Sequence, residues 1–127
     1  MSERLGAASN IWITGASSGI GLELAKQLAA KGASLILSAR RENELRQLAD
    51  SLPGEHRVVV LDLAEPEKVL ALAREILPQL PPVDILINNG GVSQRSQFLE
   101  TGLSVFQHLN TVNYLSVVAL CKAVVPD

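Results

Sequence analysis

Four short runs of the chain are rich in Ile, Leu and Val and show little alternation between apolar and polar positions. They span residues 10–14, 34–38, 57–62 and 83–88. Strands of a parallel sheet that is buried on both faces have this composition, whereas half-exposed strands alternate. The pattern therefore predicts four strands of a parallel sheet.

The segments between these runs carry apolar residues three or four positions apart and predict helices over residues 20–31, 42–52, 66–77 and about 101–125. In the first segment the apolar stripe is Ile20, Leu24 and Leu28, and Gly32 follows as a C-terminal stop. Pro66 falls in the first turn of the third segment, where a proline is tolerated. Each helix thus has one apolar face to pack on a sheet.

Strand and helix alternate throughout, which is the pattern of an α/β protein with a doubly wound parallel sheet. Right-handed crossovers place helices on both faces, and a glycine-rich first turn marks the point where the strand order reverses. We therefore predict the strand order 3-2-1-4. With 127 residues and 47% hydrophobic composition, residues 1–127 are expected to form a single domain.

Charge and composition restrict the partners. The net charge is −2, from 11 basic and 13 acidic residues that form no runs, so the chain lacks a cationic surface for nucleic acid or anionic lipid. The late apolar stretch at residues 115–125 is interrupted by Lys122 and is too short to span a membrane. We expect a small-molecule ligand and no nucleic-acid or membrane partner.

The single cysteine, Cys121, excludes an intrachain disulfide and is typical of a reducing compartment. The N-terminal residues contain no apolar core of the signal-peptide type. The sequence therefore favours a cytoplasmic protein. No grouping of His, Cys, Asp and Glu has the spacing of a metal site, and none is expected.

The first strand and the first helix are joined directly by Thr14-Gly15-Ala16-Ser17-Ser18-Gly19-Ile20-Gly21. Bare backbone N–H groups in such a turn can approach a pyrophosphate, and side chains at the three glycine positions would obstruct the turn, the ligand or the helix packing. The helix N-terminus faces the same anion with its partial positive charge. The alternative is an ordinary glycine-rich turn, which the strand before it and the helix after it argue against.

The Gly-x3-Gly-x-Gly spacing of this turn resembles that of the short-chain dehydrogenase/reductase family. Three other parts of the chain fall in register with the same family: Asp62-Leu63, Asn88-Asn89-Gly90-Gly91 and Asn113. The resemblance covers essentially the whole chain and implies a Rossmann-type nucleotide-binding fold. It also implies a cofactor site whose members in this sequence are Gly15, Ser17, Ser18, Gly19, Ile20, Gly21, Arg40, Asp62, Leu63, Asn89, Gly90 and Gly91.

Each of the three added matches also has a plain structural reading. Asp62 suits a cap of the loop after its strand, and Asn88 and Asn89 suit turn positions because Asn tolerates left-handed backbone. Their common position at the carboxyl ends of strands, where ligands bind in open α/β sheets, favours the functional reading. In the family, Asp62-Leu63 would contact the adenine ring.

The second strand ends differently from that of an enzyme specific for NAD. Such an enzyme carries Asp or Glu there to hold the ribose hydroxyls, about 20 residues past the turn. Here that position is Ala39, followed by Arg40 and Arg41. A guanidinium at Arg40 suits a 2′-phosphate, so NADP(H) is expected in preference to NAD(H). The alternative is that both arginines only pair with Glu42, Glu44 or Asp50 on the surface.

The resemblance implies hydride transfer between a nicotinamide and a small carbonyl or alcohol substrate, with a Tyr, a Lys, a Ser and an Asn as the catalytic groups. Asn113 matches the Asn, which in the family holds a relay water at a local break in its helix. The only tyrosine, Tyr114, has Val118 four positions later and is interpreted as a packing residue. His108 is likewise interpreted as a surface or packing residue.

The family's Tyr-x3-Lys lies a few dozen residues beyond its Asn, and only residues 114–127 follow Asn113. We therefore expect this chain to be the N-terminal part of an NADP-dependent dehydrogenase or reductase and to be inactive alone. A noncatalytic dinucleotide-binding or interaction module is the alternative. Without the family's remaining strands, the fourth strand becomes an exposed edge, and a homo-oligomer is expected to cover it.

Overall fold

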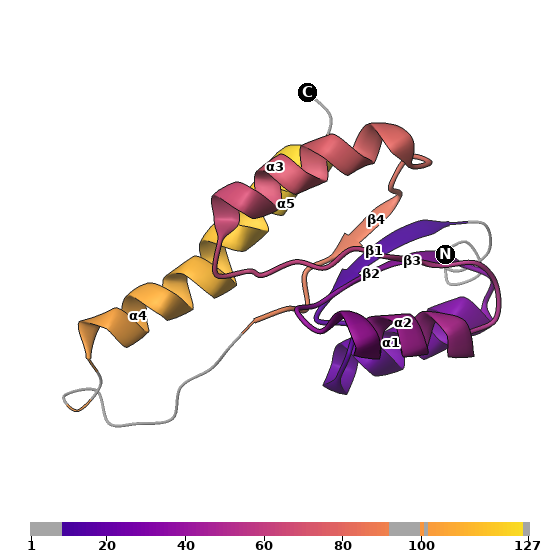
Figure 1. The fold of residues 1–127 in the computed structure, drawn as a ribbon, viewed down its shortest axis with the longest axis horizontal. Coiled ribbons are helices and arrows are strands. Elements are labelled where there is room, and N and C mark those ends of the chain that lie inside the picture. The colour runs from indigo at the N-terminus through magenta and orange to yellow at the C-terminus, as the bar shows by residue number, and fades with distance from the viewer. Residues whose placement is uncertain (1–8, 92–99, 101, 126–127) are drawn as a thin grey trace.

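The computed structural model describes residues 9–91, 100 and 102–125 (Figure 1). The sheet strands are β1 (Asn10–Thr14), β2 (Ser34–Ser38), β3 (Arg57–Val58) and β4 (Ile85–Ile87). The helical elements are α1 (Gly19–Ala30), α2 (Glu42–Ser51), α3 (Pro66–Ile76), the 3₁₀ turn η1 (Leu77–Gln79), α4 (Leu103–Asn110), the π-helical segment η3 (Thr111–Leu115) and α5 (Ser116–Val124).

All strand pairs of the sheet are parallel, and the strand order is β3-β2-β1-β4. Along the central pair, Asn10 aligns with Ser34 and Thr14 with Ser38, so β1 and β2 end at the same edge. The doubly wound sheet with order 3-2-1-4 is therefore confirmed. Its carboxyl edge carries the turn between β1 and α1, where the order reverses.

Helices cover both faces of the sheet (Figure 1). On the face of α1 and α2, the core contains Ile11, Ile13, Leu35, Leu37, Leu28, Leu45 and Leu48. On the face of α3 and α5, it contains Trp12, Ile36, Leu61, Val69, Ala73, Ala119 and Leu120. Side chains of one strand alternate between the two cores, as strand geometry requires. The buried Trp12 indole donates a hydrogen bond to the Ser38 hydroxyl at 2.8 Å.

The first helix ends as predicted but does not use its whole predicted stripe. Gly32 has a φ of 96°, and its N–H bonds to the Ala29 carbonyl at 3.0 Å. The predicted packing of Ile20 is wrong, because its side chain is 72% exposed. Ile20 lies in the first turn, beside the turn residues and beyond the sheet edge. Small residues replace it on the buried face, namely Gly21, Ala25 and Ala29.

The two outer strands are shorter than the predicted runs 57–62 and 83–88. Beyond Val58, the N–H groups of Val59 and Leu61 still donate to the carbonyls of Leu37 and Ala39 at 3.0 and 3.1 Å, but Val60 is exposed. At β4, Asp84 exchanges bonds of 2.8 Å with Asn10 before the regular ladder begins. Both strands lie at edges of the described sheet, where one side lacks a ladder partner and burial is partial.

The long predicted helix is continuous through α4, η3 and α5, with a π-helical segment between residues 111 and 115. The Thr111 hydroxyl donates to the Gln107 carbonyl at 2.9 Å, and the buried Ser116 hydroxyl donates to the Val112 carbonyl. Such bonds to the carbonyl four residues earlier compete with the regular ladder and bend helices. Tyr114 is 60% exposed in this segment, so its predicted packing role is wrong.

No helix in the described part of the chain combines the length and apolar character needed to cross a bilayer.

Candidate functional site

A cavity of about 290 Å³ opens at the carboxyl edge of the sheet. The residues that line it come from the turn after β1, the end of β2, the loop after β3, the loop after β4 and the helix α4–η3. They are Gly15, Ser17, Ser18, Ala39, Arg40, Arg41, Glu44, Leu61, Asp62, Leu63, Ala64, Gly90, Gly91, His108 and Val112. Segments far apart in sequence thus meet at the edge where the strands end.

The turn after β1 has the backbone shape that the glycine spacing predicts. Gly15 and Gly19 have φ values of 64° and 56°, a region that residues with a Cβ rarely adopt. Ser18 is the N-cap of α1, yet its side chain makes no capping hydrogen bond, and the first turn of α1 has no acidic residue. The N-terminal N–H groups and partial positive charge of α1 are therefore left for an anion.

Gly21 allows the helix to pack directly on the turn. A Cβ there would overlap the Gly15 carbonyl oxygen and lie 2.5 Å from Asn89 Nδ2. A Cβ on Gly15 would lie 2.9 Å from Gly90 Cα. No side chain fits at either position without moving backbone, so the glycines form a cradle with bare backbone walls.

The loop after β4 is bonded to this turn. Asn89 Nδ2 donates to the Gly15 carbonyl at 3.2 Å, and the Gly90 N–H donates to Thr14 Oγ1 at 2.8 Å. The next residue, Gly91, approaches the long helix, because a Cβ added to it would lie 2.7 Å from Asn113 Oδ1. The segment Asn89-Gly90-Gly91 therefore links the glycine-rich turn after β1 to the π-helical segment.

Gly90 lies against the side chains of Leu63 and Thr14. A Cβ on Gly90 would lie 2.5 Å from Leu63 Cδ1 and 3.1 Å from Thr14 Oγ1. Leu63 therefore occupies the space that an alanine methyl would need.

Asp62 serves the plain structural role and also lines the cavity. Its Oδ1 accepts a hydrogen bond from the Ala64 N–H at 3.0 Å, and its carbonyl accepts one from the Glu65 N–H at 3.1 Å. This is an Asx turn, the loop-capping alternative. The turn directs Leu63 and Ala64 along the cavity wall, so the two readings are compatible.

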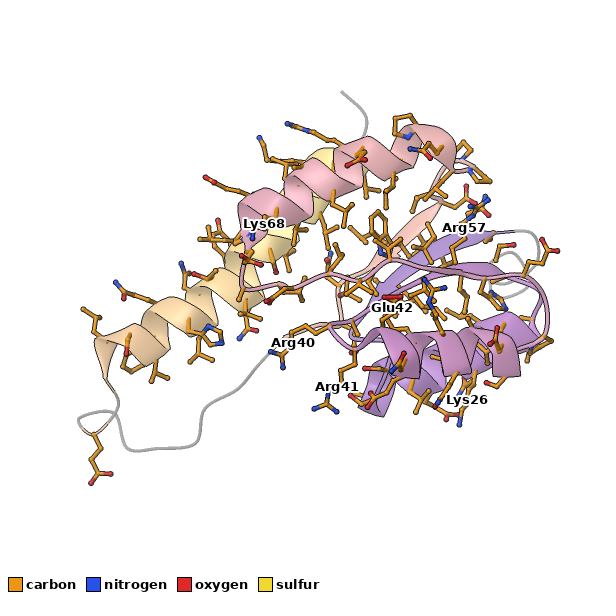
Figure 2. The ribbon with its side chains drawn as sticks, in the orientation of Figure 1. Lys26, Arg40, Arg41, Glu42, Arg57 and Lys68 are labelled. Atoms are coloured by element: carbon orange, nitrogen blue, oxygen red, sulfur yellow. The ribbon has the colours of Figure 1, made fainter. Side chains whose placement is uncertain are left out.

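The two arginines after β2 have different environments. Figure 2 shows both at the same edge of the sheet, extending in different directions. Arg41 Nη1 lies 3.2 Å from Glu44 Oε1, which is the surface pairing considered from the sequence. Glu42 pairs instead with Arg46 at 3.0 Å. Within the described residues, Arg40 forms no ion pair and lines the cavity beside Ala39.

Not every predicted site residue reaches the cavity wall. Gly19, Ile20 and Gly21 belong to the turn and the start of α1. The Asn89 amide contacts Gly15 and Gly21, Asn113 lies beside Gly91, and neither asparagine lines the cavity. Asn113 is in η3, so the predicted local break in its helix is present. The remaining predicted residues, Gly15, Ser17, Ser18, Arg40, Asp62, Leu63, Gly90 and Gly91, all line the cavity.

Several lining residues are absent from the predicted site, and two of them, His108 and Val112, come from the long helix. His108, interpreted as a surface or packing residue, is exposed and lines the cavity together with Val112. The signal was their spacing, because residues four apart share one face of a helix and Val112 directly precedes Asn113. In the described part of the chain, no cluster of three or more His, Cys, Asp or Glu side chains could hold a metal ion.

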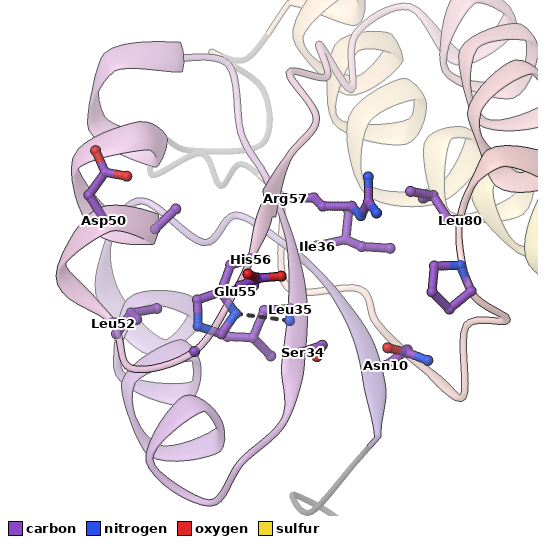
Figure 3. A pocket seen from close by; sticks show the side chains of 13 residues that line it. Asn10, Ser34, Leu35, Ile36, Asp50, Leu52, Glu55, His56, Arg57 and Leu80 are labelled. Atoms are coloured by element: carbon purple, nitrogen blue, oxygen red, sulfur yellow. Dashed lines mark hydrogen bonds between the residues drawn. The ribbon is translucent and has the colours of Figure 1, made fainter.

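A larger cavity, about 640 Å³, lies at the opposite, amino edge of the sheet (Figure 3). It is lined by residues such as Asn10, Asp50, Glu55, His56 and Arg57. His56 Nδ1 accepts a hydrogen bond from the Leu35 N–H at 3.1 Å, and its Nε2 lies 2.7 Å from the Pro53 carbonyl, to which it donates in this tautomer. Both ring nitrogens are engaged in holding the loop after α2, which the sequence did not indicate.

Comparison with known proteins identifies the family of this chain. Residues 9–127 match a family model described as short chain dehydrogenase. The chain is 47% identical over 123 residues to dehydrogenase/reductase SDR family member 7 of Mus musculus, covering 91% of this chain and 36% of the relative. It therefore spans little more than a third of that protein's length.

Solved structures share the fold. An oxidoreductase from E. coli superimposes with a TM-score of 0.87 at 31% identity, over 98% of this chain and 54% of that one. L-sorbose reductase from Gluconobacter frateurii, solved with NADPH and L-sorbose, gives 0.87 at 30% identity, over 95% of this chain and 48% of that one. With its parallel sheet, glycine cradle and family match over residues 9–127, this chain belongs to the short chain dehydrogenase family, whose members are oxidoreductases.

Proposed function

We propose that this chain binds NADP(H) and forms the nucleotide-binding part of an oxidoreductase that transfers hydride between the nicotinamide and a small carbonyl or alcohol. The observation that carries the choice of NADP(H) is Arg40. It lines the cavity at the end of β2, next to Ala39 rather than an acid, and forms no ion pair within the described residues. An unpaired guanidinium suits a phosphate dianion.

The residues around the cavity fit the successive parts of the dinucleotide. The turn from Gly15 to Gly19 and the start of α1 would hold the pyrophosphate, because no side chain caps the N-terminus of α1 and its partial positive charge favours an anion. Asp62 and Leu63 would border the adenine ring. Arg40 would bind the 2′-phosphate, which lies on the adenosine side of the molecule.

The other end of the dinucleotide would lie near Asn89, Gly90, Gly91 and the exposed Ile20. When bound, the nicotinamide supplies or accepts the hydride. Asn113 approaches Gly91 and occupies the π-helical segment, a feature often found at functional sites. In the proposed enzyme, its amide would hold a water rather than react with a carbonyl.

We further propose that this chain binds the dinucleotide without turnover. Proton transfer to a substrate oxygen needs an acid whose pKa suits neutral pH, which in the family is a tyrosine assisted by a lysine. The only tyrosine in the sequence is Tyr114, and Val118 stands where that lysine would be. A longer parent protein would supply the tyrosine, the lysine and the substrate pocket.

Titration of the chain with NADPH and with NADH tests the cofactor proposal. We expect tighter binding of NADPH, by about tenfold, because a charge-assisted bond to a phosphate contributes more than about 1.4 kcal/mol. Arg40→Ala should remove most of the difference and leave NADH affinity unchanged. Arg46→Ala is the matched control, because Arg46 lies on α2 outside the cavity. Equal affinities of the unmutated chain for the two dinucleotides would refute the proposal.

We also propose that the chain forms a homo-oligomer. Large apolar side chains are exposed along η3 and α5, namely Tyr114, Leu115, Val118 and Val125, and β4 lies at an edge of the described sheet. Exposed apolar surface and an open strand edge both favour association. Light scattering should give at least twice the mass of one chain; a stably folded monomer at tens of micromolar would argue against the proposal.

A further inference from the structure

Glu44 places a carboxylate in the cavity on the same side as the two arginines. It lies in the first turn of α2, lines the cavity, and is 3.2 Å from Arg41 Nη1 through its Oε1. The side chains of Arg41 and Glu44 are 74% and 46% exposed, so the pair is weak and can rearrange around a ligand. Glu44 is therefore both a partner of Arg41 and a wall of the proposed phosphate site.

The charges that line the cavity are balanced. Arg40 and Arg41 contribute two positive charges, and Glu44 and Asp62 contribute two negative charges. The pair Arg41–Glu44 is neutral overall, so Arg40 is the lining arginine that has no ion pair within the described residues. An arriving 2′-phosphate also meets the Glu44 carboxylate, whose charge has the same sign as its own. Like charges a few ångströms apart at a partly solvated surface repel appreciably, and salt screens this repulsion.

A second acid of the same helix turn provides a comparison. Glu42 also lies in the first turn of α2, but its Oε2 bonds to Arg46 Nε at 3.0 Å and it does not line the cavity. Both carboxylates lie near the partial positive charge of the α2 N-terminus, so this attraction is of the same kind for both. They differ in whether they border the cavity.

We propose that Glu44 is a specificity-determining residue that limits the preference of this site for a 2′-phosphorylated nucleotide. Its carboxylate opposes the phosphate and holds Arg41 in a compensated pair, so that Arg40 carries the preference largely alone. The proposal rests on the proposed function, because it concerns the same 2′-phosphate. The charge of Glu44, a residue outside the glycine cradle, would then set how strongly the site prefers NADP(H) over NAD(H).

The test uses two fragments of the dinucleotide, adenosine 2′,5′-bisphosphate and adenosine 5′-monophosphate, titrated calorimetrically into the intact chain. The quantity of interest is the ratio of their affinities, which isolates the 2′-phosphate. Glu44→Gln should raise this ratio about three- to fivefold, and Glu44→Lys should raise it further. Glu42→Gln should leave it unchanged. An unchanged ratio in Glu44→Gln, or an equal rise in Glu42→Gln, would overturn the proposal.

Salt dependence adds a readout that a change in packing would not give. The rise in the affinity ratio caused by Glu44→Gln should be largest at low ionic strength. It should shrink toward onefold near 0.5 M salt, where the screening length is only about 4 Å. A gain that is independent of salt would contradict the electrostatic account. Thermal melts of each variant verify folding, which is not at risk because Glu44 is half exposed.

The outcomes separate this inference from the proposed function. If the unmutated chain prefers the bisphosphate and Arg40→Ala removes the preference, the proposed function holds. An unchanged affinity ratio in Glu44→Gln would then overturn the present inference alone. If the unmutated chain binds neither nucleotide, or binds both equally with and without Arg40, both fail.

Discussion

The two edges of the sheet carry cavities that differ in volume and in the hydrogen bonding of their polar groups. Residues in or directly after β2 line both cavities. The cavity at the amino edge is the larger, at about 640 Å³ against about 290 Å³ at the carboxyl edge. At the amino edge, the polar groups of His56, Asn10 and Asp84 bond to neighbouring backbone or side chains. At the carboxyl edge, Arg40 forms no ion pair within the described residues and the helix N-terminus has no side-chain cap.

The difference shows that volume alone does not identify a binding site. Polar groups that already have partners must break those bonds before they can bind a ligand, whereas groups without partners gain one. The carboxyl edge also has backbone walls that approach closely because Gly15, Gly21 and Gly90 lack a Cβ. The uncapped helix N-terminus, Arg40 and the close backbone surface are why we propose the smaller cavity as the nucleotide site.

The largest expected effect comes from Gly21→Ala. The added methyl would overlap the Gly15 carbonyl and displace the Asn89 amide, so that the turn and the loop after β4 must separate. We expect a loss of about 2–3 kcal/mol in the free energy of unfolding and a fall in NADPH affinity of about tenfold or more. Urea denaturation and calorimetry measure the two effects.

Gly54→Ala is the matched control at the amino edge. Gly54 has a φ of 91°, but a Cβ there would meet only the His56 ring at 3.7 Å, an ordinary contact. Backbone strain should cost about 1–2 kcal/mol of stability, and NADPH affinity should not change. If Gly54→Ala reduced NADPH affinity as much as Gly21→Ala, the contrast between the two edges would be wrong.

A smaller effect is expected at His56, whose ring bonds to the backbone of Leu35 and Pro53 and which we interpret as a structural residue. His56→Leu leaves the Leu35 N–H without its acceptor and should lower the free energy of unfolding by about 1–3 kcal/mol, with NADPH affinity unchanged. His56→Asn retains an acceptor near the position of Nδ1 and should lose less. A fall in NADPH affinity at unchanged stability would instead indicate a ligand site at the amino edge.

Most of the fold follows from the pattern of the sequence. The central strands, the four helical segments, the Gly32 stop and the order 3-2-1-4 depend on local periodicity and on chain connectivity, which a sequence carries directly. The lengths of β3 and β4 do not follow from the sequence pattern. Hydrophobic runs at 57–62 and 83–88 specify extended chain, but regular pairing depends on neighbours that edge strands lack on one side.

The site was predictable where backbone geometry decides it and less so where side chains choose among partners. Glycines at 15, 19 and 21 specify a turn because other residues do not fit there. The pairing of Arg41 with Glu44 rather than with another acid, and the exposure of Ile20 and Tyr114, depend on rotamers and helix orientation. His56 was missed because its partner, the Leu35 N–H, is distant in sequence and belongs to the backbone.

The measurement that tests the central claim most directly is amide chemical-shift mapping of the isotopically labelled chain during titration with NADPH. The account predicts shifts at the carboxyl edge, in Gly15–Gly21, at Arg40, in Asp62–Leu63 and in Asn89–Gly91, and none in the amino-edge segment from Glu55 to Arg57. Shifts concentrated at Glu55, His56 and Arg57, with the glycine turn unaffected, would contradict it.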